Sequence, residues 1–493
     1  MRPHCIIIGS GLGGLSCGVI LAKNGYKVTV LEQHHQAGGC LQCFERRGAK
    51  FETGLHFVGS ADKGQTLHRL LSWLEVIDDI KLHRLDPERY ETLLMGGTRF
   101  ELANGAEALI EKLSAHFPKE RDNLARYCSL VGRIAGASSL HSLDERHADV
   151  ALSTRYQLSS INEVMDELFG DEMLKNVLCG EIPLLAAERD KTPFSSHAFI
   201  MDFYNQSAWR VVGGSDAIAR SLQHTIERYG GEVLTSHRVT KIVCDEKRAT
   251  AVIVNDERLL SADLIISSIH PARLVELLDT PIIRNAYRHR IGNLPETVGC
   301  FTVYLKFKPG CQSYRNYNIF GYRNSSPWGC EHYDDLSWPL GYLYMHMCDE
   351  PQQQWASSGV ILSYMRYSDV EPWQGTALGH RGSDYEAFKR ERALRLIDLV
   401  DSDMPGLKDS IECFFTSTPL SYLDYTGTEK GAMYGVARDI SLGVQGRVQH
   451  RTKIPNLLLA GQNINSHGIL GVIVGSIVSC ADILGEKTIL KQL

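Results

Sequence analysis

The sequence predicts an α/β fold in which a Rossmann-type nucleotide-binding domain is combined with a mixed α+β domain. Three observations favour this fold class. The chain opens with a strand–helix–strand pattern over residues 4–32, returns to a helix–strand pattern over residues 213–271, and closes with a strand, a glycine turn and an apolar helix over residues 456–484. We expect all three segments to join one parallel sheet, because strands connected by helices pair in parallel.

The opening segment has the periodicities of a βαβ unit. Residues 4–9 are an apolar, β-branched run, residues 13–24 carry small and apolar residues at helical spacing, and residues 27–32 alternate as a second strand. The change of period from two to about three and a half and back indicates strand, helix and strand in turn.

The middle of the chain carries apolar residues at the three-and-four spacing of one helix face. They are Ile161, Met165, Leu168, Phe169, Met173, Val177 and Leu178. The pattern predicts a helix that packs in the core; the alternative is one wall of an apolar substrate tunnel, or a surface that touches a membrane.

Between residues 297 and 370, short runs rich in Tyr, Phe, Trp, Thr and Val alternate with turn residues, which predicts an antiparallel sheet. We therefore expect five parts along the chain. They are the first part of the nucleotide-binding domain (1–80), a largely helical substrate or cap region (81–210), the second part of the nucleotide-binding domain (211–285), an antiparallel-sheet substrate domain (286–430) and the closing segment of the nucleotide-binding domain (431–493).

Composition excludes several classes of protein. An apolar fraction of 43% and a charged fraction of 22% are typical of globular proteins. A formal net charge of −6 offers no basic field for a phosphate backbone, so we expect no nucleic-acid partner. The 13 cysteines are scattered singly, which favours reduced thiols and a cytoplasmic location. No run of about 18 apolar residues occurs, so no transmembrane helix is expected.

A G-x-G-x-x-G motif lies between the first strand and the first helix. It comprises Gly9, Gly11 and Gly14, with Gly13 among them, and Glu32 ends the next strand. Gly9 allows a tight turn, Gly11 lets the backbone approach a pyrophosphate, and Gly14 lets the helix pack closely. The helix N-terminus presents free N–H groups to the anion, and Glu32 would accept hydrogen bonds from ribose hydroxyls. An acid at this place disfavours a 2′-phosphate, which leaves FAD or NAD as the ligand.

A glycine pair further along the chain favours FAD. Gly38 and Gly39 follow Glu32 closely, and Arg47 comes shortly after them. Glycines here let the chain wrap a long cofactor that continues inward, which a nicotinamide dehydrogenase does not need. We therefore predict an FAD-binding domain, with Arg47 among the residues that hold the cofactor.

These motifs resemble those of the carotenoid isomerase, phytoene desaturase and retinol saturase family of FAD-dependent oxidoreductases, and are most similar to those of bacterial retinol saturase-like proteins. The resemblance rests on the glycine motif with Glu32, Gly38-Gly39, and residues 52–59, 213–243 and 457–477. It implies that the first motif holds the ADP part of FAD, that Val239 lies on the strand whose backbone meets the adenine, and that the segment from Gly461 to Gly471 lines the ribityl chain and the isoalloxazine ring.

The closing segment supplies the remaining predicted cofactor contacts, which are Gly461, Gln462, Asn463, Gly468 and Gly471. The commoner pattern of the family has an acid after the glycine at the strand end. Gln462 and Asn463 stand there instead, so their amides are expected to hydrogen-bond the phosphate or the ribityl hydroxyls.

His56 is the candidate catalytic residue. The resemblance places its segment near the flavin, where an imidazole could deliver a proton, and the alternative is a structural histidine. Cys40 and Cys43 form a C-x-x-C for which we expect packing rather than a redox dithiol. No metal site is predicted, because the nearby histidines do not complete a zinc spacing.

Four tyrosines of the predicted sheet could line an apolar tunnel, or could belong to the ordinary core of the sheet. They are Tyr304, Tyr342, Tyr344 and Tyr364.

The resemblance implies an FAD-dependent oxidoreductase acting on carbon–carbon double bonds of a long apolar, polyene-like or isoprenoid lipid, by retinol saturase-like reduction or carotenoid-type cis/trans isomerisation. The alternatives are a phytoene-type desaturase, an amine oxidase-like flavoenzyme on the same fold, and a flavin- or NAD-binding regulator. The expected partner is an apolar small molecule. No second dinucleotide motif is present, so the redox partner stays open. A substrate that dissolves in lipid also favours transient contact with a membrane surface, as a peripherally associated protein.

Overall fold

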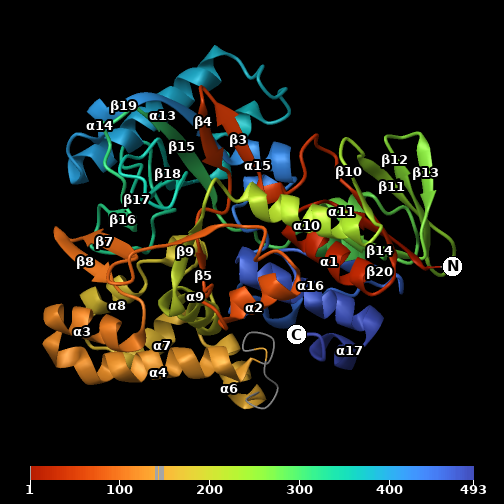
Figure 1. Ribbon diagram of the computed structural model, residues 1–493, viewed down its shortest axis with the longest axis horizontal. Coiled ribbons are helices and arrows are strands. Elements are labelled where there is room, and N and C mark those ends of the chain that lie inside the picture. The colour runs from red at the N-terminus through yellow and green to blue at the C-terminus, as the bar shows by residue number, and fades with distance from the viewer. Residues whose placement is uncertain (1, 139–142, 144–148) are drawn as a thin grey trace.

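A five-stranded parallel sheet forms the centre of the nucleotide-binding part of the computed structural model, which describes residues 2–138, 143 and 149–493. Its strands come from widely separated parts of the chain (Figure 1). In spatial order they are β10 (Glu232–Leu234), β2 (Lys27–Leu31), β1 (His4–Ile8), β14 (Leu264–Ser267) and β20 (Leu457–Leu459). The three segments predicted to share one sheet therefore do so.

Alternate residues of these strands enter two separate hydrophobic cores. On β1, Cys5 and Ile7 pack in one core, whereas Ile6 and Ile8 pack in a second core on the opposite face. All four side chains are 4% exposed or less. Because both faces of the sheet are covered, the strand reads in sequence as a continuous apolar run rather than as an alternation.

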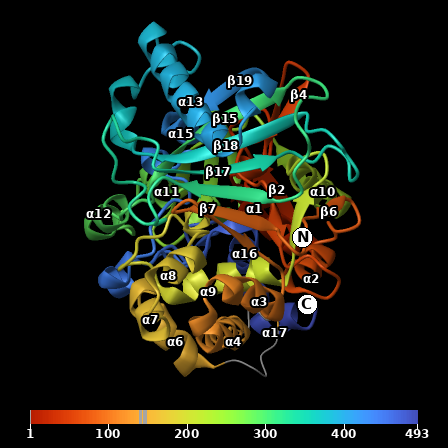
Figure 2. The same ribbon diagram turned by 90° about the vertical axis from the view of Figure 1, so that its left-hand side faces the viewer.

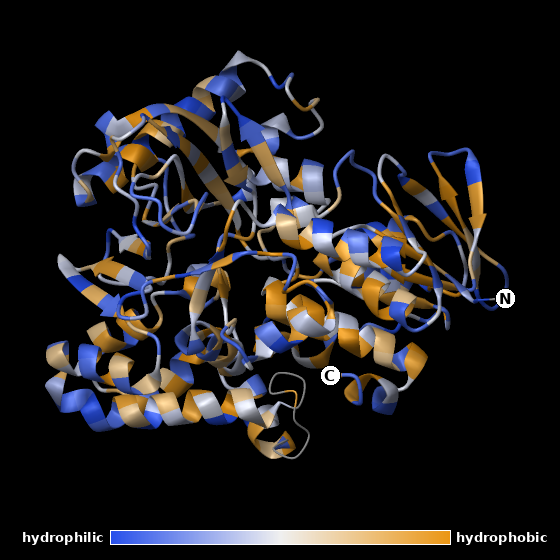
Figure 3. Ribbon diagram, viewed as in Figure 1, coloured by the Kyte–Doolittle hydropathy of each residue, from blue (hydrophilic) through white to orange (hydrophobic). Residues whose placement is uncertain are grey.

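Three helices cover the first face, and a small sheet covers the second. The helices α1 (Leu12–Lys23), α10 (Asp216–Arg228) and α16 (Gly468–Leu484) pack together, with α1 between the other two. Most of α16 is hydrophobic (Figure 3), as expected for a helix buried along most of its length. On the other face lie the antiparallel strands β11 (Val239–Cys244), β12 (Ala249–Val254) and β13 (Arg258–Ser261), with α11 (Pro271–Glu276) and α12 (Asn285–Gly292).

The second large sheet has seven strands and is mixed rather than purely antiparallel. Its spatial order is β19 (Ile411–Ser417), β15 (Gly299–Phe307), β18 (Ser358–Met365), β17 (Gly341–His346), β16 (Asn318–Tyr322), β7 (Glu91–Met95) and β8 (Thr98–Leu102). The prediction of an antiparallel sheet within the later part of the chain was therefore incomplete. The hairpin of β7 and β8 comes from the region expected to be largely helical, and β7 pairs with β16 in parallel.

Helices lie on both sides of this sheet (Figure 2). The long helix α13 (Ser383–Asp403) packs against β17 and β18 on one side. On the other side lie α3 (Ala106–His116), α4 (Arg121–Ala137), α6 (Val150–Leu158), α7 (Ile161–Leu168), α8 (Glu172–Leu178) and α9 (Phe194–Gln206).

The apolar stretch between residues 161 and 178, expected to be one helix, forms two. Helix α7 ends before Phe169, which is extended, and Gly170 follows it. Asp171 then accepts a hydrogen bond from the Leu174 N–H at 3.0 Å and caps the new helix α8. A glycine followed by an N-cap residue is a sufficient local reason for the break.

The remaining elements are short and connect these layers. They are β3 (Cys43–Arg46) paired with β4 (Ala49–Glu52), β9 (Ala208–Val211) between β5 (Val58–Gly59) and β6 (Leu82–Arg84), the helices α2 (Thr66–Trp73), α14 (Leu407–Ser410), α15 (Pro419–Thr426) and α17 (Glu486–Leu490), and the 3-10 helices η1 (Gly39–Leu41), η2 (Pro118–Glu120), η4 (Ile182–Leu184), η5 (Tyr367–Asp369), η6 (Glu371–Trp373), η7 (Glu429–Gly431) and η8 (Ile440–Gly446). Within the described ranges, no helix has both the length and the apolar character needed to cross a bilayer.

Candidate cofactor and substrate site

One cavity of about 1350 Å³ runs from the glycine-rich turn of the parallel sheet to the seven-stranded sheet and to helices α4, α6 and α9. This volume exceeds the roughly 300–1,000 Å³ of an ordinary small-molecule pocket, so a dinucleotide and a second molecule fit together. The lining contains the predicted residues Gly9, Gly11, Gly13, Glu32, Gly38, Gly39, His56, Val239, Gly461, Gln462, Asn463, Gly468 and Gly471.

An added side-chain atom would overlap other protein atoms at two glycines of the turn and would enter open space at a third. A Cβ atom at Gly14 would overlap the carbonyl oxygen of Gly9, and one at Gly13 would lie 2.7 Å from Cα of Gly461. A Cβ at Gly11 would meet only Ser268 Oγ, at 3.9 Å. Gly14 therefore serves packing and does not line the cavity, whereas Gly11 opens onto it.

Helix α1 begins at this turn without a side-chain cap. Its N-cap is Gly11, and no side chain bonds to the free N–H groups of the first turn. Uncapped N–H groups and the positive end of the helix dipole form a site for an anion. The residues present therefore fit the diphosphate of a dinucleotide.

Glu32 is held rigidly at the end of β2. One carboxylate oxygen accepts hydrogen bonds from the Ser10 N–H at 3.0 Å and from Ser10 Oγ at 2.6 Å, and the other accepts from the His34 N–H at 2.9 Å. The side chain is buried and lines the cavity. It can accept further hydrogen bonds from ribose hydroxyls through its free lone pairs.

Asn463 lines the cavity as expected, although the protein engages its side-chain oxygen, whereas Arg47 is placed differently from our expectation. The Asn463 side-chain oxygen accepts the Val436 N–H at 2.9 Å. This oxygen therefore stabilises the backbone at Val436 instead of contacting a ligand. Arg47 forms the two-residue turn with Gly48 between β3 and β4, at φ values of 54° and 74°. It is exposed and does not line the cavity. A tight hairpin directs this residue to the hairpin tip, and the assignment of Arg47 to the cofactor is corrected accordingly.

His56 lies on the cavity lining beside a buried carboxyl group. Its Nδ1 is 3.5 Å from Glu52 Oε2, and neither ring nitrogen has a hydrogen-bond partner among the described residues. The other Glu52 oxygen accepts the Ser215 N–H at 3.0 Å. Burial raises the pKa of Glu52, and His56 and Arg210 oppose that shift. Glu52 can thus orient the imidazole while Nε2 remains free for the cavity.

Sequence reasoning missed a stacked pair at the N-terminus of α16. The rings of Tyr434 and His467 lie 4.4 Å apart at an angle of 24°, and both residues line the cavity. Burial lowers the pKa of His467 to about 3, and the positive charge of Arg438 acts in the same direction. His467 is therefore neutral at physiological pH. Tyr434 and Arg438 lie in a stretch without a motif, so no local signal pointed to them.

Tyrosine hydroxyls fasten the loop between α8 and α9 to the cavity wall. Tyr434 donates to the Pro183 carbonyl at 3.3 Å, Tyr322 donates to the Gly180 carbonyl, and Tyr90 donates to Glu181 Oε1 at 3.0 Å. Burial raises the pKa of the Glu181 carboxyl. Because Tyr322 and Tyr434 also line the cavity, this loop holds their rings in place.

Away from the nucleotide end, the cavity lining is mostly apolar. It includes Ile134, Pro183, Leu184, Phe199, Ile200, Phe203, Leu343, Leu362, Leu470 and Val474. Of the four tyrosines singled out, Tyr342 and Tyr364 line the cavity, and the buried Tyr364 hydroxyl has no hydrogen-bond partner within the described chain. Tyr304 and Tyr344 pack in cores of the seven-stranded sheet instead.

The acidic residues of the described lining all have partners within the protein. Glu32 is at the nucleotide end, Asp424 pairs with Arg381, and Asp439 caps η8. Glu276, at the end of α11, pairs with Arg273. A cationic substrate would therefore meet no carboxylate without a partner on the described lining.

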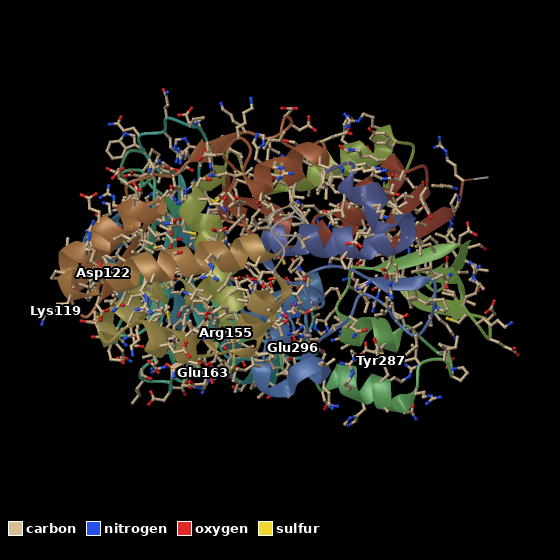
Figure 4. All side chains as sticks on the ribbon, turned by 90° about the horizontal axis from the view of Figure 1, so that it is seen from below. Lys119, Asp122, Arg155, Glu163, Tyr287 and Glu296 are labelled. Atoms are coloured by element: carbon tan, nitrogen blue, oxygen red, sulfur yellow. The ribbon has the colours of Figure 1, made fainter. Side chains whose placement is uncertain are left out.

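One face of α6 lies over the opening of the cavity. Val150, Ser153, Thr154, Gln157 and Leu158 all line it, at helical spacing. Arg447, which follows η8, bonds to Gln157 Oε1 at 3.4 Å and so joins η8 to α6. Arg155 of α6 projects from the side of the molecule seen in Figure 4.

Four exposed apolar side chains lie on α6 and on η8, which contacts α6, and we call them the mouth patch. They are Val150 (77%), Leu158 (58%), Leu442 (38%) and Val444 (74%).

Cys40 and Cys43 behave as packed thiols. Burial raises the pKa of Cys40 to about 11 and that of Cys43 to about 12. Because the thiolate is the reactive form, neither cysteine has the environment of a redox centre. Within the described residues, no cluster of three or more His, Cys, Asp or Glu side chains could hold a metal ion.

Comparison with known proteins gives consistent results. The family described as flavin containing amine oxidoreductase matches residues 12–355. The all-trans-retinol 13,14-reductase of Homo sapiens is 26% identical over 97% of this chain and 85% of its own. The prolycopene isomerase 1 of an Oncidium hybrid cultivar is 23% identical over 99% of this chain and 84% of its own.

Solved structures share the whole fold. An oxidoreductase from Methanosarcina mazei has a TM-score of 0.64 at 17% identity, with 97% of this chain and 99% of the other covered. Cyclohexylamine oxidase from Brevibacterium oxydans IH-35A has a TM-score of 0.61 at 15% identity, with 98% and 99% covered. The predicted fold class is confirmed.

Proposed function

The chain belongs to the flavin-containing amine oxidoreductase family, with FAD as its cofactor, and from this premise we propose that it reduces or isomerises carbon–carbon double bonds of a long apolar isoprenoid. The observation that carries the proposal is the apolar part of the cavity, which extends beyond what a dinucleotide needs. The names of the retinol reductase and prolycopene isomerase relatives support the same class of substrate.

The amine oxidase-like alternative is less well supported by the cavity. An ammonium group is costly to bury without a carboxylate partner, and the four acidic residues of the described lining already bond within the protein. The binding of a polyene, by contrast, is stabilised in proportion to the apolar surface that the lining removes from water.

When bound, FAD supplies the hydride chemistry, and the chain supplies binding, orientation and the exclusion of water. Gly11, the N-terminus of α1 and Glu32 would hold the ADP part of FAD. The stacked rings of Tyr434 and His467 form part of the wall near the N-terminus of α16. His56, oriented by Glu52, is our proposed proton donor to the substrate, through Nε2.

The proposed activity is tested by anaerobic reduction of the purified protein, followed by addition of all-trans-retinol or a cis-carotenoid. Reoxidation of the flavin together with a saturated product is expected for a reductase, whereas a changed isomer without reoxidation identifies an isomerase. Reduced free FAD is the control. If neither polyene reacts, and simple amines instead cause oxygen consumption, the amine oxidase-like alternative replaces this proposal.

We also propose that the mouth patch touches a lipid surface, from which the substrate enters. Two of its side chains, Val150 and Leu158, line the cavity, and the other two lie on η8, which contacts α6. Arg447, which also lines the cavity, carries a charge that anionic head groups attract. The contact is peripheral, through the mouth patch alone.

Replacement of both Val150 and Val444 by aspartate is expected to weaken binding to phosphatidylcholine–phosphatidylglycerol vesicles, measured by sedimentation, at least about 100-fold, because each buried valine contributes roughly 1.5 kcal/mol or more. Leu259→Asp is the matched control. Leu259 is 61% exposed but lies on β13, on the far side of the parallel sheet. Equal loss of binding in both variants, or in neither, would contradict the proposal.

A further inference from the structure

Arg438 is a cation on the cavity lining that has no acidic partner among the described residues. Its guanidinium makes one hydrogen bond, to the Gln462 carbonyl at 3.5 Å, and no ion pair joins it to a described carboxylate. Two other arginines of the lining differ. Arg273 pairs with Glu276 and Glu429, and Arg447 bonds to Gln157.

The surroundings of Arg438 make an unpaired charge costly. Burial lowers the pKa of its guanidinium to about 10, and the nearby Arg447 adds repulsion. At that pKa the group remains charged at neutral pH. A half-buried charge without a counter-ion is costly, so an anion is expected in the cavity beside it.

Arg438 and the first turn of α1 contact neighbouring residues of the closing segment. Gly13 in the first turn of α1 lies against Gly461, where a Cβ atom would come within 2.7 Å of its Cα. Gln462 is the next residue, and its carbonyl accepts the Arg438 hydrogen bond. The guanidinium and the first turn of α1 thus both contact the closing turn at Gly461 and Gln462, and both line the cavity.

We propose that Arg438 is the charge partner of the FAD diphosphate, which it binds opposite the N-terminus of α1. Arginine suits this role because its fixed fork of N–H donors matches phosphate oxygens. The inference rests on the proposed function only in requiring FAD, and it does not depend on the substrate.

The test uses Arg438→Gln and Arg438→Lys, with FAD, ADP and adenosine as the ligands. Loss of a charge-assisted contact is expected to weaken FAD and ADP binding about 10- to 100-fold in Arg438→Gln, with adenosine binding unchanged. Lysine keeps the charge but not the fork, so Arg438→Lys is expected to show a smaller loss in the same direction. The flavin absorption spectrum and midpoint potential should stay as in the wild type.

Arg273→Gln is the matched control, because Arg273 lines the same cavity but pairs with Glu276 and Glu429. Two results would overturn the inference. One is unchanged ADP affinity with a lowered midpoint potential, which would place the guanidinium at the isoalloxazine ring; the other is no change in either quantity. If Arg438→Gln does not fold, the ADP affinity of Arg438→Lys decides. A wild-type protein that binds FAD and ADP but converts no polyene contradicts the proposed function and leaves this inference standing.

Discussion

Gly11→Asp is expected to yield a folded protein that has lost FAD. Gly11 is the N-cap of α1 with an extended backbone (φ −62°, ψ 171°), so an L-residue fits without strain. Aspartate is also a favourable N-cap, worth about 1 kcal/mol relative to poor caps. The new carboxylate, however, would enter the cavity where the diphosphate binds, because the added Cβ meets only Ser268 Oγ.

We expect FAD affinity to fall at least about 100-fold, or roughly 2.7 kcal/mol, while the melting temperature of the apoprotein stays equal or rises. Fluorescence titration of FAD and thermal unfolding measure the two quantities. Gly11→Asn is the matched control, since it caps the helix with similar volume and no charge, and its smaller loss isolates the repulsion. A Gly11→Asp protein that is purified with full FAD content would refute this account of the glycine-rich turn.

His56→Gln is expected to lower the rate of polyene reduction about 100-fold while FAD remains bound. The range for a positioned proton donor is roughly 10²- to 10⁴-fold, and glutamine keeps a polar side chain without an imidazole that can deliver a proton. Single-turnover reoxidation of the reduced flavin by the polyene measures the step. FAD content and the flavin spectrum should be unchanged, because His56 is not among the groups assigned to the ADP part.

Two further variants separate catalysis from packing. Glu52→Gln is expected to give a smaller loss and an altered pH profile, because Glu52 acts only through the orientation of His56. His332→Gln, at a histidine with a side chain 79% exposed, should have no effect. If His56→Gln reduces the polyene at the wild-type rate, another group or water delivers the proton, and His56 is structural.

Parts of the site that depend on contiguous residues could be predicted from the sequence. The turn from Gly9 to Gly14 and the acid at Glu32 belong to one βαβ unit, in which local backbone conformation and strand pairing place the residues relative to one another. The closing strand and helix α16 were also evident, because a helix buried along most of its length requires a mostly apolar run. The family resemblance connected these local segments to FAD, and the family match confirms that assignment.

The remaining features depend on contacts between residues far apart in the chain. Strand β7 joins the second sheet through pairing with β16, more than two hundred residues later, and no periodicity encodes that choice of partner. Arg47 seemed to belong to the cofactor site by its place after the glycine pair, but a two-residue hairpin turn carries it to the surface.

The sequence by itself determined the nucleotide-binding unit, the cofactor class and the apolar character of the chain's interior, because these follow from local conformation and hydrophobic period. Only the tertiary structure decided which groups meet in the cavity. The stacking of Tyr434 on His467, the Glu52 carboxyl beside His56 and the unpaired Arg438 beside Gln462 all depend on how distant segments pack. Burial and charge partners are properties of that packing, and the ionisation of a side chain in the cavity follows from them.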